Sequence, residues 1–453
     1  MQKIFQEVTS LDKRCYEKFH LTEDILMEHA ANGMAQYIQK KFPKKSKVII
    51  VVGSGNNGAD GLALARLLHK EYKVKIFPLK EAKSPMALLQ KQRCDTLGIQ
   101  TISTLQKCDV LVDALVGTGF QGKFDDTISK TIQQINTLKA FKIACDVPSG
   151  YKIFANVTLT MGALKRDMFL DKHKEYVGKI KVINLGVTRK VYETQTNWYL
   201  LDQKDLKLPY RTQKDTHKGT YGHLALLSGE KSGATILSGL SALKFGAGLV
   251  TLITQSKEPS IPPILMQSHT LPKTTSALAV GMGLGKNQPF LQDFLANDYP
   301  LVIDADLFYQ DIIQTLLQRK NVIITPHPKE FVSLLKIINL ADITIQTLQE
   351  NRFDYVELFC KTYPNVTLLL KGANVIIGQK EQFFINPHGT SALAKGGSGD
   401  VLSGLIGSLL AQGYSPLQSA INASLTHTKL AKKCKQNNFS LTPDNLILQL
   451  ESL

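Results

Sequence analysis

The stretch Lys395-Gly396-Gly397-Ser398-Gly399-Asp400 is followed directly by an apolar run over residues 401–411. The glycines let the backbone come close to a ligand, and the apolar run predicts a helix. Unpaired N–H groups at the start of such a helix, together with the helix dipole, can hold an anion such as a phosphate. A carboxylate beside a phosphate repels it, so Asp400 suits a base acting on a hydroxyl next to the phosphate being transferred. The alternative is that Asp400 only caps the helix.

The rest of the chain alternates between strand-like and helix-like segments, and its 453 residues are enough for two or three domains. Repeated βα units predict parallel sheets with helices on both faces. A polar, lysine-rich stretch at 202–221 marks the expected linker, with domains at 1–204 and 205–453. The expected strands are 47–52, 73–79, 110–113, 142–145, 223–227, 249–253, 278–280, 302–303, 322–324, 366–370 and 382–385, and the expected helices, besides one after Thr22, are 58–69, 85–97, 125–138, 234–245 and 401–411.

Composition narrows the class of protein and its partners. No apolar run reaches the ~20 residues that a membrane span needs, and residues 1–20 do not resemble a signal peptide. The six cysteines are scattered without a C-x-x-C pair, which favours reduced thiols in a cytoplasmic protein over a zinc site. We therefore expect no membrane partner and a cytoplasmic location.

The net charge of +16 raises the question of nucleic-acid binding. However, the lysines are spread along the chain and no nucleic-acid-binding motif is present. A basic background, or a positive field that favours anionic small molecules, explains the charge equally well. We expect small-molecule substrates and no nucleic acid.

A second glycine-rich loop, Gly53-Ser54-Gly55-Asn56-Asn57-Gly58-Ala59-Asp60-Gly61, follows the strand expected at 47–52. It formally matches G-x-G-x-x-G, the dinucleotide pattern. The next strand, however, ends in Leu79-Lys80-Glu81, with no clean acidic residue at its tip to hold a ribose. The loop also carries amide and carboxylate side chains beyond what a pyrophosphate needs. These suit substrate hydroxyls or a hard cation.

Two later strands of this half end in similar loops. One reads Asp113-Ala114-Leu115-Val116-Gly117-Thr118-Gly119 and the other reads Asp146-Val147-Pro148-Ser149-Gly150. The carboxyl ends of parallel strands converge on one crevice, so Asp60, Asp113 and Asp146 are expected to face one ligand. The alternative is that these aspartates cap helices or set turns.

These three loops, in this order, resemble the NAD(P)H-hydrate epimerase family. The resemblance implies a Rossmann-like three-layer domain that interconverts the R and S forms of hydrated NAD(P)H. It implies Asp146 as the acid/base residue and Asn57, Asp113 and Ser149 as potassium ligands. Ala59 stands where the family often has glycine. The residues implied to hold the substrate, besides Asp146, are Asn56, Asn57, Gly58, Ala59, Asp60, Gly117, Thr118, Gly119, Phe120, Gln121, Gly122 and Lys123.

The second half resembles the ADP-dependent NAD(P)H-hydrate dehydratases of the ribokinase-like superfamily. The motifs that carry this resemblance are His217-Lys218-Gly219, Gly233-Ala234, Gly281-Met282-Gly283-Leu284-Gly285, Asp304-Ala305-Asp306, Thr325-Pro326-His327-Pro328-Lys329-Glu330, Leu370-Lys371-Gly372-Ala373, Gly389-Thr390 and the Gly396–Asp400 loop. The sequence departs from the family pattern at two places. It has Glu230-Lys231-Ser232 where the family usually has an aromatic residue, and Leu307-Phe308 after Asp306 where the family usually has Ala-Leu-Asn.

The resemblance implies a ribokinase-like α/β domain in which Asp400 is catalytic. The implied contacts to the hydrate are Ala234, Gly283, His327 and Asp400, and the implied contacts to ADP are Lys371, Gly372, Ala373, Asn374, Val375 and Gly399. Without the family pattern, His327 suits a structural hydrogen bond and Lys371 a solvated strand end. Magnesium is expected with the nucleotide.

The two halves together predict a bifunctional enzyme that repairs hydrated nicotinamide cofactors, assembled as a homo-oligomer. ADP and ATP, and NADHX and NADPHX, stay open as alternatives. The alternative function is a ribokinase-type small-molecule kinase with a non-catalytic nucleotide-binding N-terminal domain, which leaves the three N-terminal loops unexplained.

Overall fold

The computed structural model describes residues 1–120, 122–286, 291–433 and 437–453. Two compact units make up the chain, one of Lys3–Thr196 and one of Met1–Gln2 with Asn197–Leu453. Both alternate strands and helices, which confirms the predicted α/β class. The functional boundary after residue 204 stays a prediction. Among the described residues, no helix has both the length and the apolar character that a membrane span requires.

The unit Lys3–Thr196 is built on a parallel sheet in the order β3-β2-β4-β5-β6-β8. A short strand β1 (Gln2–Phe5) pairs in parallel with β7 (Leu164–Lys165). The sheet strands are β2 (Lys47–Val52), β3 (Lys73–Pro78), β4 (Val110–Ala114), β5 (Phe141–Cys145), β6 (Val157–Met161) and β8 (Lys179–Ile183).

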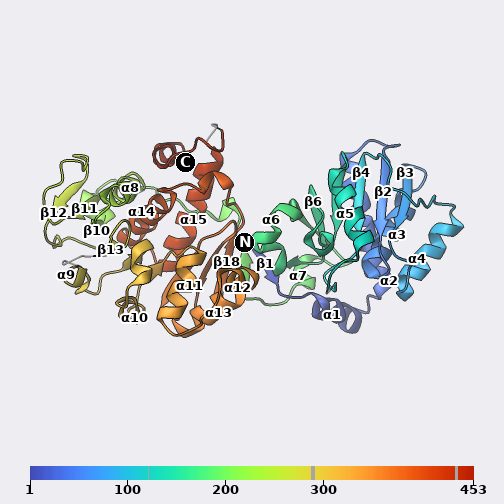
Figure 1. Ribbon diagram of the computed structural model, residues 1–453, viewed down its shortest axis with the longest axis horizontal. Coiled ribbons are helices and arrows are strands. Elements are labelled where there is room, and N and C mark those ends of the chain that lie inside the picture. The colour runs from blue at the N-terminus through green and yellow to red at the C-terminus, as the bar shows by residue number, and fades with distance from the viewer. Residues whose placement is uncertain (121, 287–290, 434–436) are drawn as a thin grey trace. The chain divides into compact units, whose positions relative to one another are not determined.

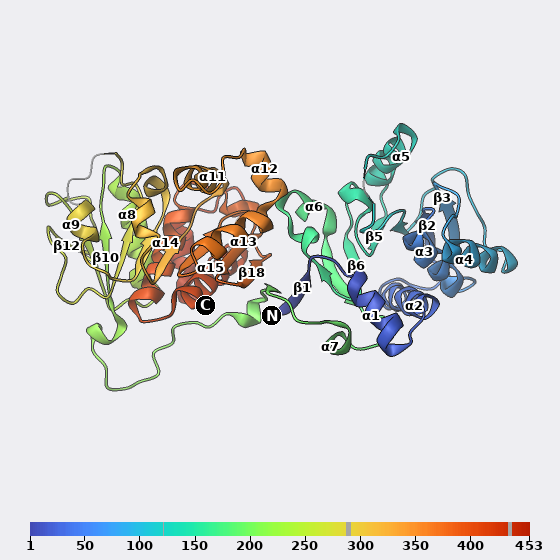
Figure 2. The same cartoon turned by 90° about the horizontal axis from the view of Figure 1, so that it is seen from below.

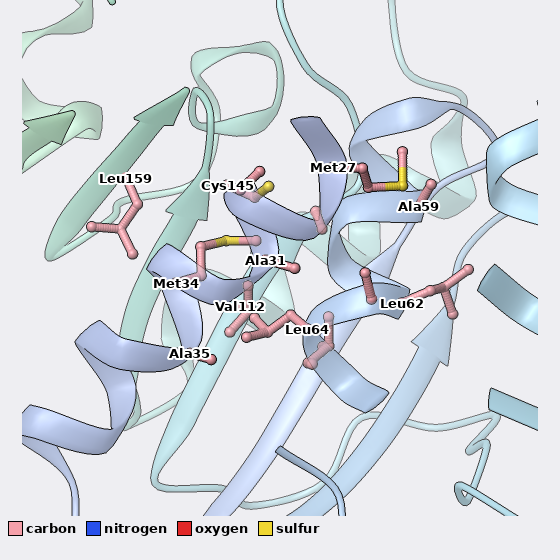
Figure 3. Close-up of a cluster of buried hydrophobic side chains, with 14 of the residues drawn as sticks. Met27, Ala31, Met34, Ala35, Ala59, Leu62, Leu64, Val112, Cys145 and Leu159 are labelled. Atoms are coloured by element: carbon pink, nitrogen blue, oxygen red, sulfur yellow. The ribbon is translucent and has the colours of Figure 1, made fainter. Parts of the chain in front are cut away.

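Helices cover both faces of this sheet (Figure 1). Alternate residues of a strand point to opposite faces, so Ile50 packs in the core with α2, α3 and α4, whereas Val51 packs with α5. Figure 3 shows Met27, Met34 and Leu62 in the first of these cores. The helices are α1 (Thr9–Phe19), α2 (Glu23–Lys41), α3 (Asn56–Leu68), α4 (Pro85–Thr96), α5 (Asp126–Thr137), α6 (Lys174–Val177) and α7 (Arg189–Tyr192).

The unit Asn197–Leu453 contains a sheet in the order β12-β11-β10-β13-β14-β15-β16-β17-β18-β9. It is parallel from β12 to β16, and an antiparallel hairpin, β17 and β18, follows. Its strands are β9 (Trp198–Leu200), β10 (His223–Leu227), β11 (Leu249–Ile253), β12 (Met266–Ser268), β13 (Ala277–Val280), β14 (Leu301–Ile303), β15 (Val322–Ile324), β16 (Val366–Leu370), β17 (Val375–Gln379) and β18 (Gln382–Asn386).

Helices also lie on both faces of this second sheet (Figure 2). Ile377 of β17 packs in one core with α14 and α15, and a Cβ on the next residue, Gly378, would meet Cys360 of α13. The helices are α8 (Ser232–Lys244), α9 (Leu291–Leu295), α10 (Ile313–Leu316), α11 (Pro328–Ile337), α12 (Ile345–Glu350), α13 (Arg352–Thr362), α14 (Ser398–Ala411), α15 (Pro416–Lys433) and α16 (Pro443–Gln449).

Two glycine-rich loops are shorter than the sequence pattern suggests. Helix α14, expected to begin at residue 401, begins at Ser398, and α3, expected to begin at residue 58, begins at Asn56. Gly399 and Asp400 therefore lie within the first turn of α14, and Asn56 and Asn57 lie within the first turn of α3. Polar side chains in a first turn sit beside the unpaired N–H groups of the helix.

Candidate active sites

A cavity of about 600 Å³ opens at the carboxyl ends of β2, β4 and β5, and α1 and α2 supply further walls. We call it the N-terminal cavity. It brings together most of the residues expected to hold the substrate. Those lining it are Asn56, Asn57, Asp60, Gly117, Thr118, Gly119, Phe120 and Asp146.

The remaining expected substrate residues of this half that the structure describes do not line the cavity. Gly58 and Ala59 are buried in the first turn of α3, where a Cβ on Gly58 would lie 2.2 Å from the carbonyl oxygen of Gly53. Gly122 and Lys123 follow the cavity loop in sequence, and Gln121 lies outside the described residues. Gly58 thus allows the tight first turn of α3, from which Asn57 and Asp60 reach the cavity.

Asp146 is held in place by its backbone and by a buried lysine. Its φ of +67° is the left-handed region, which costs a non-glycine residue roughly 1–2 kcal/mol. Its Oδ1 accepts hydrogen bonds from Lys165 Nζ at 2.5 Å and from the Met161 amide at 3.0 Å. Lys165 is only 3% exposed. The carboxylate therefore has a fixed direction in the N-terminal cavity.

Two further carboxyls in the N-terminal cavity, Asp60 and Asp12, have raised pKa values. Burial raises the pKa of Asp60 well above its usual range, and the nearby Asp146 carboxylate adds to the shift. Burial is also the main cause of the raised pKa of Asp12. Sequence reasoning missed Asp12 and Lys165. Asp12 is one acidic residue on a helix, and a lysine in a two-residue strand is ordinarily solvated.

Asp113 and Ser149 lie beside the N-terminal cavity and join two strand-end loops. Ser149 donates to Asp113 from its backbone N–H at 2.8 Å and from its hydroxyl at 2.5 Å. Asp113 is fully buried, and burial raises its pKa to about 6 although these hydrogen bonds oppose the shift. Asp113 therefore fixes the turn at Ser149, as the alternative interpretation of the sequence had it.

These residues fit a hard monovalent cation such as potassium. The Val116 carbonyl lies 3.2 Å from Ser149 Oγ, so carboxylate, hydroxyl and carbonyl oxygens are close together. Asn57, in the first turn of α3, adds an amide oxygen, because its Oδ1 would lie 3.6 Å from a Cβ on Gly117. A cation here would offset the burial of the Asp113 carboxylate.

In the second unit, the glycine-rich loop leads into α14 as an anion site requires. Gly397 is the N-cap, with φ +85°, and no side chain makes a capping hydrogen bond. Asp400 is the third helical residue, so the reading of Asp400 as the N-cap is wrong. A Cβ on Gly399 would lie 3.4 Å from Lys371 Nζ, so this lysine reaches the start of the helix.

Lys371 is paired rather than solvated. Its Nζ donates to Asp304 Oδ1 at 2.7 Å, and Ser403 of α14 donates to Asp304 Oδ2 at 2.6 Å. Asp304 is 2% exposed. The pKa of Asp400 is raised to about 6, first by burial and then by the Asp304 carboxylate, while Lys371 opposes the shift. This gives Asp400 the character of a base that works near neutral pH.

His327 forms a reciprocal cap at the start of α11. Its Nδ1 accepts from the Glu330 amide at 3.1 Å, and its own amide donates to Glu330 Oε2 at 2.7 Å. Because Nδ1 accepts, the ring proton of neutral His327 lies on Nε2, 3.2 Å from Glu330 Oε1. Burial lowers the pKa of His327 and raises that of Glu330 to about 7. Glu330 therefore gives His327 the structural role that the sequence suggested, and the ring is half-exposed.

The other expected residues of this unit are the implied contacts to the hydrate, Ala234 and Gly283, and the implied contacts to ADP that surround the turn after Lys371. Gly283 lies against Ala234, because a Cβ on Gly283 would be 3.1 Å from that of Ala234. Gly372 and Ala373 turn beside Gly389, Asn374 is buried, and Val375 begins β17. The Ser398 hydroxyl also lies 3.1 Å from Nε2 of His427, a buried histidine that sequence reasoning missed.

The fold and the two sites define an α/β protein of two compact units, with a carboxyl-lined cavity in one and a glycine-rich helix start beside a lysine in the other. Residues 224–451 match the family described as NAD(P)H-hydrate dehydratase, and residues 23–167 match the family described as YjeF-related protein N-terminus.

Curated relatives extend this likeness over the whole chain. The bifunctional NAD(P)H-hydrate repair enzyme Nnr of Helicobacter pylori is 43% identical, with 100% of both chains covered. The enzyme of that name from Coxiella burnetii is 30% identical over 95% of this chain and 94% of its own. A structure of the ADP/ATP-dependent NAD(P)H-hydrate dehydratase from Bacillus subtilis, co-crystallised with ATP and Mg²⁺, is 27% identical, with TM-score 0.48 over 57% of this chain and 98% of that one. The chain belongs to the bifunctional NAD(P)H-hydrate repair enzyme family.

Proposed function

We propose that this chain repairs hydrated nicotinamide cofactors by two reactions. The N-terminal cavity epimerises R- and S-NAD(P)HX. The site at α14 dehydrates the S form to NAD(P)H at the expense of ADP, giving AMP and phosphate. The observation that carries the proposal is the presence in one chain of a fixed carboxylate, Asp146, in a cavity and a second carboxyl, Asp400, on an anion-binding helix start.

In the epimerase, Asp146 would move a proton to or from the hydroxyl at C6 of the reduced ring. Lys165 holds Asp146 in position, and the polar side chains of Asn56 and Asp60 offer hydrogen bonds to the substrate. Asn57, Asp113 and Ser149 would hold potassium, which supplies positive charge beside the buried carboxylate when bound.

In the dehydratase, Asp400 would take the proton from the C6 hydroxyl as its oxygen attacks the β-phosphate of ADP. Lys371 and the N–H groups at the start of α14 would stabilise charge on the phosphoryl oxygens, and AMP would leave. The phosphate then leaves from C6, the adjacent carbon C5 loses a proton, and the electron pair of that C–H bond restores the C5=C6 double bond of the ring. Among the described residues no three His, Cys, Asp or Glu side chains gather as a metal cluster, which suits magnesium carried chiefly by the phosphates of the nucleotide.

We also propose a homo-oligomer and a cytoplasmic location. The described cysteines, Cys15, Cys94, Cys108, Cys145 and Cys360, are all unpaired thiols, which a reducing compartment preserves.

The decisive experiment incubates the full chain with mixed NADHX epimers and ADP and follows the absorbance of restored NADH. We expect complete conversion of both epimers, with one AMP formed for each NADH. Conversion that stops once the S form is consumed would remove the epimerase assignment. Accumulation of a phosphorylated sugar or vitamin with ATP, and no NADH, would favour a ribokinase-type kinase instead.

A further inference from the structure

Asp12 and Tyr192 form a hydrogen-bonded pair at the N-terminal cavity that the chemistry above does not use. The Tyr192 hydroxyl donates to Asp12 Oδ1 at 2.7 Å. Tyr192 is buried, Asp12 is half-buried, and Asp12 lines the cavity together with Asp146. A carboxyl with a fixed direction, next to another in one cavity, is an arrangement suited to proton transfer.

The two carboxyls reach the N-terminal cavity from different walls. Asp146 follows strand β5 of the sheet, whereas Asp12 lies on helix α1, and α1 is not part of the βα units. A substrate ring bound between these walls would present one face to each carboxyl.

Tyr192 is fixed by its surroundings. A Cβ on Gly162, which has φ +72°, would lie 2.6 Å from the Tyr192 hydroxyl oxygen, so only glycine leaves room for the phenol. Arg14 of α1 donates to the Tyr192 carbonyl at 2.9 Å. Because Tyr192 is held in one position, its hydroxyl can fix the orientation of the Asp12 carboxyl.

We propose that Asp12 is a second acid–base residue of the epimerase and acts on the face of the substrate ring opposite to Asp146. This inference rests on the proposed epimerase function. In one direction Asp12 gives its proton to the C6 hydroxyl, the C6–O bond breaks, water leaves, and the lone pair of the ring nitrogen forms a C=N bond. A water molecule then adds to the other face of C6, its proton passes to Asp146, and the electron pair returns to nitrogen. The reverse epimerisation moves the proton from Asp146 to Asp12, so one water leaves and one enters each time.

The charges around Asp12 suit this role. The titratable groups of the described residues that interact with it are Tyr192, Lys165, Asp146, Asp60, Glu7, Cys15 and Tyr16. Burial raises the pKa of Asp12, and Asp146 and Glu7 raise it further, while Tyr192 and Lys165 lower it. Asp146 by contrast contacts the Lys165 ammonium. The raised pKa of Asp12 suits a group that gives a proton to the substrate.

The first test is Asp12→Asn, in which the amide oxygen can still accept from Tyr192. Interconversion of pure R- and S-NADHX is followed by chromatography without ADP, after the spontaneous rate is subtracted. We expect a loss of about 100-fold or more in kcat/KM for epimerisation, with unchanged dehydration of S-NADHX when ADP is added. Glu17→Gln is the matched control, an exposed carboxylate on the same helix outside the N-terminal cavity. Normal epimerisation by Asp12→Asn overturns the inference. Absence of epimerisation in the unmodified chain would instead refute the proposed function.

The second test is Tyr192→Phe, which keeps the ring and removes the hydrogen bond that lowers the pKa of Asp12. In the direction in which Asp12 is the acid, the alkaline limb of the pH–rate profile should move to higher pH. In the direction in which it is the base, the acid limb should move to higher pH. A uniform loss at every pH, with neither limb displaced, means a structural role for the pair and overturns the inference. This profile also decides the question if Asp12→Asn loses dehydration as well.

Discussion

At the scale of single residues, Asp400 makes the dehydratase activity dependent on pH. A base must be ionised, and burial raises the pKa of Asp400 to about 6. We therefore expect kcat/KM for dehydration of S-NADHX to be constant well above pH 6 and to fall as the pH drops through about 6, since the carboxyl is then protonated. The measurement is the rate of NADH formation across pH 5–8 with saturating ADP.

Asp400→Asn tests the same assignment by removing the base. We expect dehydration to fall by about 10²–10⁴-fold, while epimerisation in the N-terminal cavity continues at its normal rate. Normal regeneration of NADH from the S hydrate by this variant would show that another group removes the proton. If the dehydration rate of the unmodified chain stays constant as the pH drops through about 6, Asp400 is not the titrating group.

At the scale of secondary-structure elements, the alternation of apolar runs predicted most strands of the two sheets but missed β1, β6, β7, β8, β9, β12 and β17. The strands at 47–52, 223–227, 249–253, 322–324 and 366–370 are confirmed to the residue, because buried parallel strands are short runs of branched apolar side chains bounded by turns. The hairpin strand β17 was missed because its sequence directly continues the Lys371 turn.

The candidate sites were predictable only where a local motif carries the chemistry. The glycine loops and the aspartates after the strands could be read from the sequence, since their positions follow from local turns. Asp12 and Lys165 reach their sites through tertiary packing. Nothing local distinguishes Lys165 from a solvated lysine, although it is almost fully buried against Asp146. The position of such residues in the site depends on which helix packs over which strand end, and local sequence does not determine that.

The start of α14 depends on a single glycine, which gives a prediction for the element as a whole. Gly397 has φ +85°, and a Cβ there would lie 2.5 Å from Pro443 and 2.9 Å from Leu237. Gly397→Ala should therefore destabilise the fold by roughly 1–3 kcal/mol, measured as a lower midpoint of urea unfolding. Gly396→Ala is the control, because a Cβ at Gly396 meets no atom within 4 Å. Equal midpoints for the two variants would mean that the helix start tolerates a side chain at either position.

At the scale of the whole molecule, the two sites belong to separate compact units, each with its own sheet and core. Spontaneous hydration gives both epimers, and the dehydratase is proposed to use only one, so the two activities have to meet at a common intermediate, S-NADHX. If that intermediate is released into solution, the sites need not be on the same chain. The fusion would then serve to keep the two activities at equal concentration.

This reasoning predicts complementation between chains. An equimolar mixture of Asp146→Asn and Asp400→Asn variants, each with one intact site, should convert both epimers of NADHX completely with ADP. Either variant alone should fail within the same time, the first stopping after the S form and the second forming almost no NADH. Because free S-NADHX must reach another chain, the rate of the second half of the reaction should rise with protein concentration. A mixture that stops after the S form, while the unmodified chain reaches completion, would mean that the intermediate passes between sites within one chain.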